Sequence, residues 1–563
     1  MEEKQEPKKD LLAGIEQEIK DVLYQYLKAE SFTGTAGERA SERFLMKHLS
    51  QIPYFADHPE YYGTYSIEGD PFGRAVCYAM VKGEGANTVV LLHHQDVVGV
   101  EDFKRLRPYA FSPDQLGEAL LTIKDSLPHD ARADLEGGKF LFGRGTADMK
   151  GGGAIQLSLL ERYSRLKRLK GNILLVAVPD EENLSAGMRA GVKLLADLKE
   201  RHGLNYRLMI NSEPHGRKDP ALGTFSEGSI GKIMPFVYVR GYLSHISKNF
   251  EGFNPLNLMS EIVRNTEWNM DFFDSVKQES APLPTWLYLK DGKTHYDVSM
   301  PLSVSGCFSV MTLKQSPALV MEKVEQICRD SFENVLADME HKNRHFAEMA
   351  GREAGKLPWN VKVVNFAQLR SQAQQTHGRR FQEAYEKKIA DLAKQLNKGS
   401  MNMIESNFAL VEFLFDYVDD LAPQVVYGLI PPYYSNVSNL YFQDLEPEIA
   451  HLSKTLDAFT WETYQQHYEA EHFFTGISDL SYTSIQDGTG TLETLRTFMP
   501  LLGTCYQIPL EEIQRISMPC MNIGPWGKDL HKLTERVSKE DLYEQTPRII
   551  NKAISVVLKE PGI

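Results

Sequence analysis

The chain has 563 residues, of which 42% are hydrophobic and 25% are charged. This composition is typical of a soluble globular protein, and it excludes a wholly disordered or collagen-like chain. The 62 basic and 76 acidic residues give a net charge of −14, which argues against a general nucleic-acid or anionic-membrane binder. Length alone predicts about three to four domains.

Cysteine usage and the first residues predict the compartment. The five cysteines are far apart and form no CxxC pair, which is typical of a reducing compartment with buried thiols. The N-terminal MEEKQEPKKDLL contains no apolar leader, and no apolar run reaches the about 18 residues that a membrane span requires. We therefore expect a cytoplasmic protein with no membrane partner.

The first part of the chain predicts strands that alternate with helices. Helical spacing of apolar residues predicts a helix over 10–29, whereas the continuous run Val89–Leu92 is typical of a strand covered on both faces. The charged residues 101–137 predict a loop-rich insertion. Strand-like GNILLVAVPDEE, a helix over 182–203 and strand-like YRLMINSEP follow, and this alternation predicts an α/β sheet with right-handed crossovers.

The pattern changes after about residue 222. Three strand-like and two helix-like segments between 223 and 340 predict a small α+β module, and the charged residues 340–424 predict further helices. Strand-like QVVYGLIPPYY then returns, followed by helices near 440–470, 530–540 and 547–558.

Residue types that commonly bind metals stand at the predicted ends of strands, where open α/β sheets bind their ligands. Taken singly, an acid after a strand is more often a helix N-cap or part of a solvated turn, and a histidine there is more often a packed residue. Four such segments in order favour a metal site over turn chemistry. They contribute His94 and Asp96, Asp148, Glu181 and Glu182, and Glu213.

Imidazole and carboxylate together suit zinc, with manganese or cobalt as substitutes. Two ions a few ångströms apart need a bridging carboxylate, which one Asp can supply. Asp96, two residues after His94, can orient that imidazole. Of the adjacent Glu181 and Glu182, one can bind a metal while the other moves a proton.

The motifs HHQDVV, GRGTADMKGG, PDEENLSAGM, SEP and GPWGKDLHKLTERV together resemble the zinc aminoacylase/carboxypeptidase family, which includes the ArgE and DapE deacylases and bacterial dipeptidases. The resemblance implies an α/β fold: a di-zinc, aminopeptidase-like catalytic domain, with a mixed sheet flanked by helices, over 1–222 and 425–563. It also implies an inserted α+β lid or dimerisation domain over 223–424, which the helix-rich stretch 340–424 would enlarge.

The same resemblance implies the ligands of two metal ions. His94, Asp148 and Glu213 would hold one ion, and Asp148, Glu182 and His531 would hold the other, with Asp148 as the bridge. From the residues alone, His531 reads as a histidine on a surface helix, so its assignment depends on the family.

Three further roles follow from the resemblance. Glu181 would be the general base, Asp96 would orient His94, and His245 in RGYLSHI would polarise the scissile carbonyl, often from a neighbouring subunit. His93 and His472 match no motif position and are interpreted as structural. The family's late Asp-x-Arg strand is missing here, which leaves weak candidates for binding the substrate carboxylate, namely Arg240, Asn249 and Lys314.

We therefore expect a metal-dependent hydrolase that cleaves an amide-type C–N bond with a metal-bridging water and a Glu base. Its substrate would be a small amino-acid derivative, N-acyl or N-carbamoyl, and EGSIGKIMPFVYVRGYLSHI resembles the arginine-utilisation branch, which implies citrulline, arginine or ornithine chemistry. A dipeptidase or carboxypeptidase and a non-catalytic binding protein remain the alternatives. No nucleic-acid partner is expected, and a homodimer through the lid is one arrangement that the family implies. GRGTADMKGGG lacks the spacing of a phosphate-binding loop.

Overall fold

The computed structural model describes residues 10–560, so most of the charged N-terminal segment MEEKQEPKKDLL lies outside it. The chain divides into two compact units, which we call unit 1 and unit 2. Unit 1 comprises 1–229, 437–486 and 509–563, and unit 2 comprises 230–436 and 487–508. Residues 425–436 and 487–508, which the sequence-based division left in the catalytic domain, fall in unit 2, and 223–229, which it placed in the lid, fall in unit 1.

Unit 1 is built on a mixed eight-stranded sheet in the order β1-β2-β5-β3-β6-β19-β7-β18. Strands β5, β3, β6 and β19 run parallel to one another, and β2 and β7 pair antiparallel to this group. The strands are β1 (Tyr62–Ser66), β2 (Ala75–Val81), β3 (Glu84–His94), β5 (Lys170–Val178), β6 (Asn205–Asn211), β7 (Leu222–Ser226), β18 (His467–Glu471) and β19 (Cys520–Asn522).

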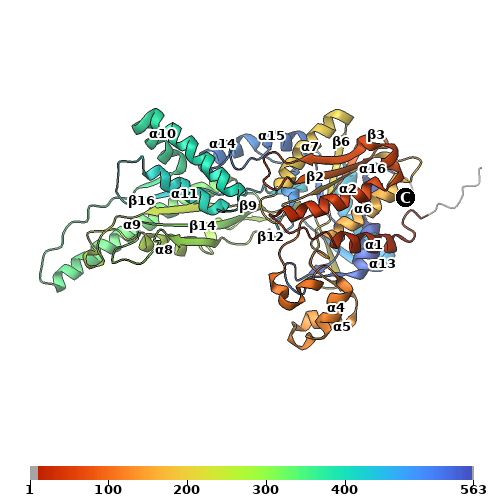
Figure 1. Ribbon diagram of the computed structural model, residues 1–563, viewed down its shortest axis with the longest axis horizontal. Helices are drawn as coiled ribbons and strands as arrows, with labels where there is room; N and C mark the ends of the chain where they lie inside the picture. The colour runs from red at the N-terminus through yellow and green to blue at the C-terminus, as the bar shows by residue number, and fades with distance from the viewer. Residues whose placement is uncertain (1–9, 561–563) are drawn as a thin grey trace, which may run out of the picture. The chain divides into compact units, whose positions relative to one another are not determined.

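Helices cover both faces of this sheet, which explains its continuous apolar strands. The side chains of Leu91 and Leu175 pack in one hydrophobic core with helices α1, α6 and α16, whereas α7 contacts β1, β2 and β5 (Figure 1). The predicted mixed sheet flanked by helices is confirmed. The helices of unit 1 are α1 (Ile15–Leu27), α2 (Arg39–Ser50), α3 (Pro53–Asp57), α4 (Pro113–Leu121), α5 (His129–Gly137), α6 (Lys150–Ser164), α7 (Ala186–His202), α12 (Pro447–Ala450), α13 (Leu452–Tyr464), α15 (Leu510–Ile516) and α16 (Thr546–Leu558).

Two small sheets complete unit 1. One joins β4 (Phe140–Phe142), β20 (Gly527–Lys528) and β21 (Arg536–Ser538), and the other joins β8 (Gly228–Ser229) and β17 (Val437–Ser438). The insertion 101–137 is largely helical rather than loop-rich, since it contains α4, α5 and the short helical turn Glu101–Tyr109. Leu116 and Leu120 on α4 are buried in the main core. Tertiary packing therefore stabilises helices that the charged composition of this segment did not predict.

Unit 2 is an α+β module on a second sheet, in the order β13-β14-β10-β16-β15, with β9 paired to β14. Its strands are β9 (Gly231–Ile233), β10 (Pro235–Arg240), β13 (Thr285–Asp291), β14 (Ser303–Thr312), β15 (Val363–Asn365) and β16 (Gln424–Leu429), with a separate hairpin of β11 (Ser275–Val276) and β12 (Glu279–Ser280). Its helices are α8 (Pro255–Thr266), α9 (Pro317–Met349), α10 (Phe366–Asn397), α11 (Met403–Phe415) and α14 (Gly488–Phe498).

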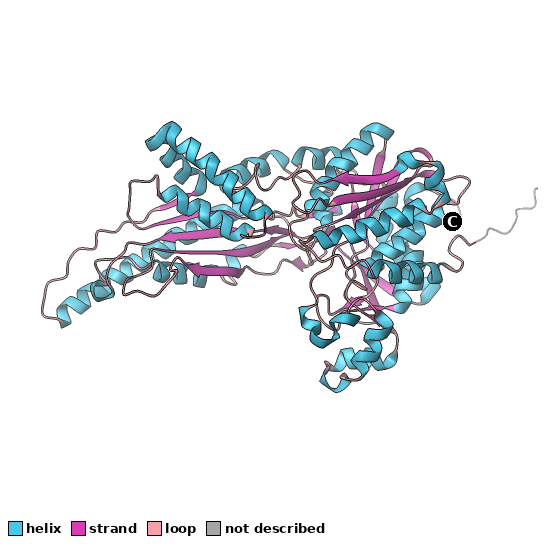
Figure 2. Ribbon diagram, in the orientation of Figure 1, coloured by secondary structure: helices cyan, strands magenta, loops and turns pink. Residues whose placement is uncertain are grey.

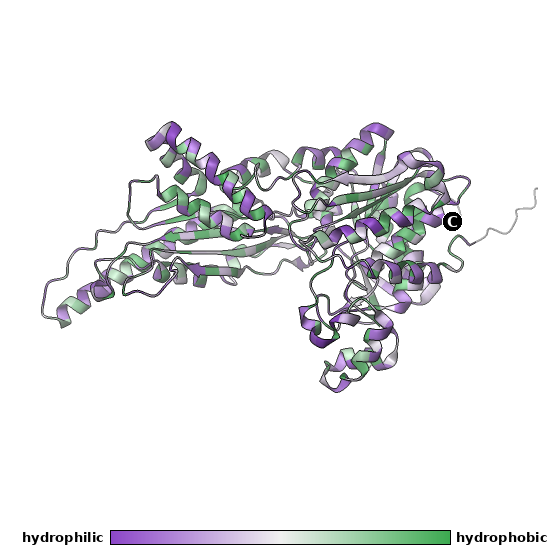
Figure 3. Ribbon diagram, viewed as in Figure 1, coloured by the Kyte–Doolittle hydropathy of each residue, from purple (hydrophilic) through white to green (hydrophobic). Residues whose placement is uncertain are grey.

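Helices α10 and α11 of the helix-rich stretch 340–424 cover the second face of the unit 2 sheet (Figure 2). On β10, Val237 and Val239 pack in one core with α8 and α9, whereas Phe236 and Tyr238 pack in another with α10 and α11. Figure 3 shows hydrophilic residues along α10 and hydrophobic residues along the strands of this sheet. None of the helices over residues 10–560 is long and apolar enough to cross a membrane.

Candidate metal centre

The parallel strands of unit 1 end side by side. In the sheet register, His94 lies opposite Val178, and Leu92 lies opposite Asn211. The residues that directly follow β3, β5 and β6 therefore meet at one edge of the sheet, as the sequence predicted. His94 is the last residue of β3, Glu181 and Glu182 follow β5, and Glu213 follows β6.

Asp148 reaches the same edge from the turn between β4 and α6. Helix α6 begins at Lys150, which three glycines follow, and a Cβ on Gly152 would lie 2.3 Å from the backbone oxygen of Ser212. Only glycine permits this close approach, which brings the first turn of α6 against the residue that precedes Glu213. The glycine run thus carries Asp148 to the ends of the strands.

His531 lies in the loop of the β20–β21 hairpin, so the helix predicted over 530–540 is wrong. Asp529 and His531 have φ angles of 52° and 65°, in the left-handed region that a helix excludes. Leu530 and Leu533 do pack against the core, but pairing of β21 with β4 overrides the helical spacing. His531 is half exposed, and its Nε2 atom points to the cluster.

The side chains form two sets of three that share Asp148. In the first, His94 Nε2 lies 3.0 Å from Asp148 Oδ1 and 3.5 Å from Glu213 Oε1. In the second, His531 Nε2 lies 3.0 Å from Asp148 Oδ2 and 2.9 Å from Glu182 Oε1. The two oxygens of Asp148 therefore face different histidines.

This geometry suits two divalent cations. Tetrahedral zinc with bonds of about 2.1 Å has ligand atoms about 3.4 Å apart, close to the distances above. Asp148, Glu182 and Glu213 are largely buried with Glu181 beside them, and two imidazoles cannot balance four carboxylates. Buried charges of one sign are costly unless a cation neutralises them, so the cluster is compatible with two metal ions.

The pKa shifts of the cluster residues show the same excess of negative charge. Burial raises the pKa of Glu213 well above its usual value, and the charges of Asp148 and Glu182 add to this, against the opposing charge of His94. Burial likewise raises the pKa of Glu181. Hydrogen bonds to Asp148 and Glu182 raise the pKa of His531 to about 10. The raised pKa values mean that bound protons neutralise part of the negative charge that metal cations would otherwise neutralise.

Asp96 contacts both His94 and the glutamate loop, the loop that carries Glu181 and Glu182. His94 Nδ1 lies 3.1 Å from the Asp96 backbone oxygen and 3.6 Å from Oδ1 of the Asp96 carboxylate. The carboxylate accepts hydrogen bonds from the backbone N–H groups of Glu181 and Glu182, at 3.2 and 3.3 Å. The Thr33 hydroxyl donates a further bond at 2.9 Å. Asp96 therefore links the imidazole to the glutamate loop. Glu181 offers a carboxylate oxygen within 4.8 Å of the His94 and Glu213 ligand atoms.

His245 belongs to unit 2 and not to the unit that holds the cluster. It follows β10, its Nδ1 atom lies 2.7 Å from Ser247 Oγ, and it caps the short helical turn Ile246–Lys248. The three candidates for binding a substrate carboxylate also lie in unit 2, at Arg240, Asn249 and Lys314.

Sequence reasoning missed an ionic network that supports the glutamate loop. The Arg74 guanidinium lies 2.7 Å from both Glu38 and Asp180, and Glu38 accepts a hydrogen bond of 2.8 Å from the Asp180 backbone N–H. All three side chains are buried, and Asp180 directly precedes Glu181. Arg74 and Glu38 belong to no motif, so only the fold reveals this role.

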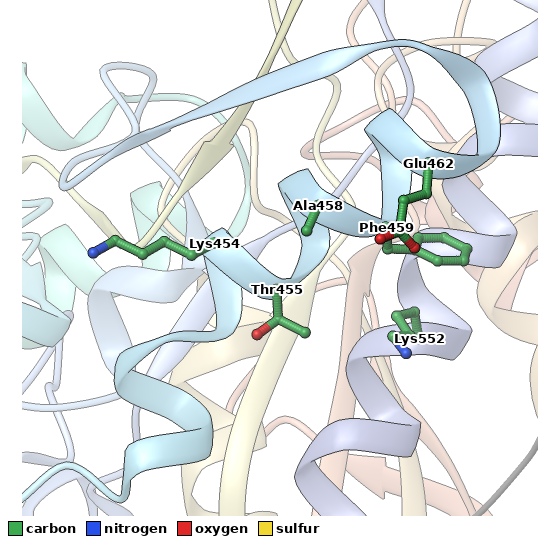
Figure 4. A pocket seen from close by; sticks show the side chains of 6 residues that line it. All are labelled: Lys454, Thr455, Ala458, Phe459, Glu462 and Lys552. Carbon is green, nitrogen blue, oxygen red and sulfur yellow. The ribbon is translucent and has the colours of Figure 1, made fainter.

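Two further features, His93 and one surface depression, contribute no side chain to the two ligand sets. His93 is fully buried, and its Nδ1 atom lies 3.0 Å from Gln156 Oε1, which agrees with the structural interpretation of this histidine. A depression on α13 and α16 contains none of the cluster residues (Figure 4). It is lined by Lys454, Thr455, Ala458, Phe459, Glu462 and Lys552.

Known proteins match more than nine-tenths of the chain. The uncharacterized protein YqjN of Bacillus subtilis (strain 168) is 31% identical over 551 residues, which cover 96% of this chain and 97% of YqjN. The protein RocB of the same organism is 28% identical over 567 residues, which cover 94% of this chain and 95% of RocB.

Solved structures share the fold. The M20 family metallo-carboxypeptidase Sso-CP2 from Sulfolobus solfataricus aligns with a TM-score of 0.54 at 11% identity, over 96% of this chain and 99% of that one. The di-peptidase Dug1p from Saccharomyces cerevisiae aligns with a TM-score of 0.52 at 11% identity, over 98% and 99%. A family model described as peptidase family M20/M25/M40 matches residues 123–554. The chain thus belongs to this peptidase family and is a metallohydrolase.

Proposed function

We propose that the protein hydrolyses an amide-type C–N bond in a small amino-acid derivative, N-acyl or N-carbamoyl, within arginine catabolism. The observation that carries the proposal is the pair of ligand sets that share Asp148, with Glu181 beside them. We assign His94, Asp148 and Glu213 to one ion. Asp148, Glu182 and His531 would hold the other ion, and zinc is the metal that we propose, with manganese or cobalt as substitutes.

When bound, the two ions supply Lewis acidity at the substrate carbonyl and at the attacking water. Glu181 accepts the proton of that water and returns it to the leaving amine. Asp96 holds the His94 imidazole and, through the backbone N–H groups of the glutamate loop, holds Glu181 in place.

His245 and unit 2 have a proposed part in this chemistry that rests on the RGYLSHI motif. We assign to His245 the stabilisation of the developing oxyanion, and to unit 2 the role of a lid that excludes water. Pairing of two chains through unit 2 stays a prediction, which light scattering of the purified protein tests.

A peptidase is the main alternative to the proposed substrate class. An arginine-related substrate rests on the resemblance of EGSIGKIMPFVYVRGYLSHI to the arginine-utilisation branch, whereas the metallo-carboxypeptidase and di-peptidase folds favour a peptidase. A screen of citrulline, N-acyl-ornithines, N-acyl-arginines and dipeptides separates them. Ammonia release from citrulline supports an N-carbamoyl substrate, and cleavage of dipeptides alone supports the peptidase. A binding protein without catalysis would tolerate broken ligand sets, but both sets are complete.

The role of Glu181 gives the sharpest test of the mechanism. Glu181→Gln should lower kcat by about 10²–10⁴-fold, because the amide cannot accept the proton, while metal content equals that of the wild type. Activity assays and elemental analysis of the same preparation measure both. Glu227→Gln is the matched control, since the Glu227 carboxylate accepts a hydrogen bond from the Ser453 hydroxyl and pairs with His472 rather than with a cluster residue. Normal turnover by Glu181→Gln would refute the assigned base.

A further inference from the structure

The segments that carry Asp148 and His531 are joined by strand pairing. Strand β4 runs directly into the turn that holds Asp148, and β21 directly follows the loop that holds His531. In the antiparallel register Phe142 lies opposite Arg536, and one residue further the Gly143 N–H donates to the Glu535 backbone oxygen at 3.0 Å. The two ligand loops therefore leave the small sheet at the same point.

The Glu535 side chain fills that junction. It is fully buried, and its Oε1 atom accepts hydrogen bonds from the backbone N–H groups of Gly145, Ala147 and Asp148, at 2.8, 3.3 and 3.3 Å. Its Oε2 atom accepts a hydrogen bond from the Arg144 guanidinium, which is also buried. One carboxylate from the His531 loop thus fixes the backbone of the Asp148 turn.

The opposite side of the loop is fixed by Arg536. This fully buried guanidinium pairs with Asp130 at 2.6 Å and Asp134 at 2.7 Å on α5, and with Asp529 at 2.5 Å in the loop itself. The Asp529 carboxylate also accepts a hydrogen bond from Thr534. Arg536 therefore holds the His531 loop to α5, and Glu535 links the same loop to the Asp148 turn.

We propose that Glu535 is a positioning residue that sets His531 against Asp148 and thereby controls the affinity of the second metal ion. The inference rests on the proposed ligand sets. Without the carboxylate, three buried N–H donors and one guanidinium lose their acceptor, and the turn and the loop can move independently. Side chains that orient metal ligands typically control metal affinity or activity about 10–100-fold.

The test is a chelator titration of the zinc-loaded full chain that counts the zinc released. Glu535→Gln keeps the shape of the side chain, but its amide cannot accept from the turn and from Arg144 together. We expect one of two zinc ions to leave at a chelator concentration at least about tenfold below that for the wild type, while the other is retained. In the activity assay kcat should fall with KM unchanged, and added zinc should restore kcat.

Two variants control this experiment. Glu227→Gln should release zinc as the wild type does. Glu535→Asp keeps the charge but shortens the reach, so its release should fall between that of Glu535→Gln and the wild type, and it supplies the test if Glu535→Gln does not fold. The positioning role is overturned if both ions leave at the wild-type concentrations. It is equally overturned if both ions leave together with a loss of thermal stability that zinc does not restore.

The readout uses no substrate, so it separates this inference from the proposed function. An active Glu181→Gln enzyme would refute the assigned base and leave the zinc titration unchanged. Wild-type zinc release in Glu535→Gln would refute the positioning role alone.

Discussion

The charge balance of single residues governs the candidate centre. Asp148 places one oxygen against each histidine. Burial alone would raise its pKa, but hydrogen bonds to His531 and His94 and their charges outweigh burial and hold the pKa below the usual range. Its neighbours Glu181 and Glu213 have raised pKa values because burial adds to mutual repulsion. A site of this kind gains most from cations, because each ion lowers the cost of several buried carboxylates at once.

His93 gives a prediction for pH dependence. Burial lowers its pKa to about 4, against about 6.5 in an unfolded chain, so the unfolded state takes up the proton first as the pH falls. The fold therefore loses stability between about pH 6.5 and pH 4, by about 2 kcal/mol at pH 5 from this group. Urea unfolding at pH 7.5 and pH 5 should show a smaller drop for His93→Gln than for the wild type. An equal drop in the free energy of unfolding of both proteins would contradict the lowered pKa of His93.

The sequence predicted some site residues from their own surroundings and others only through the family. His94, Glu182 and Glu213 follow strands whose apolar runs are unmistakable, so their convergence could be predicted from the sheet. His531 could not, because the spacing of apolar residues around it favours a helix, whereas the segment forms a hairpin loop with left-handed residues. Glu535 escaped as well, since a glutamate in LTERV reads as surface charge until strand pairing buries it.

At the scale of elements, helix α5 and the β20–β21 hairpin depend on each other. Arg536 and Lys528 of the hairpin both pair with Asp130 and Asp134 of α5. The insertion that contains α5 was predicted as loop, because its charged residues show no core-facing pattern. Asp130 and Asp134 instead pair with the buried guanidinium of Arg536, which lies about 400 residues further along the chain.

Asp134→Asn tests this dependence. The change leaves Arg536 fully buried with one carboxylate fewer, and we expect a loss of about 2 kcal/mol in the free energy of unfolding. Thermal unfolding followed by circular dichroism measures it. Glu136→Gln on the same helix is the control, since Glu136 pairs only with the half-exposed Lys124 and Arg132 and should leave the transition unchanged. A similar small effect of both substitutions would show that the α5 contact is dispensable.

At the scale of the whole molecule, length misled the domain count. About three to four domains follow from 563 residues, yet the chain divides into two units because each is large. Unit 1 has eight strands in its main sheet, and unit 2 has helices on both faces of its sheet. Strand composition predicted the α+β character of unit 2, but only the two separate cores show that α10 and α11 form a full layer.

The central claim is that two metal ions share Asp148, and one measurement tests it most directly. Elemental analysis of the purified chain and of Asp148→Ala should find two divalent ions per wild-type chain and fewer than two per variant chain, with activity lost in the variant. The loss follows because both ligand sets depend on one carboxylate. Two ions retained by Asp148→Ala, or full activity of a metal-free wild type, would contradict the account.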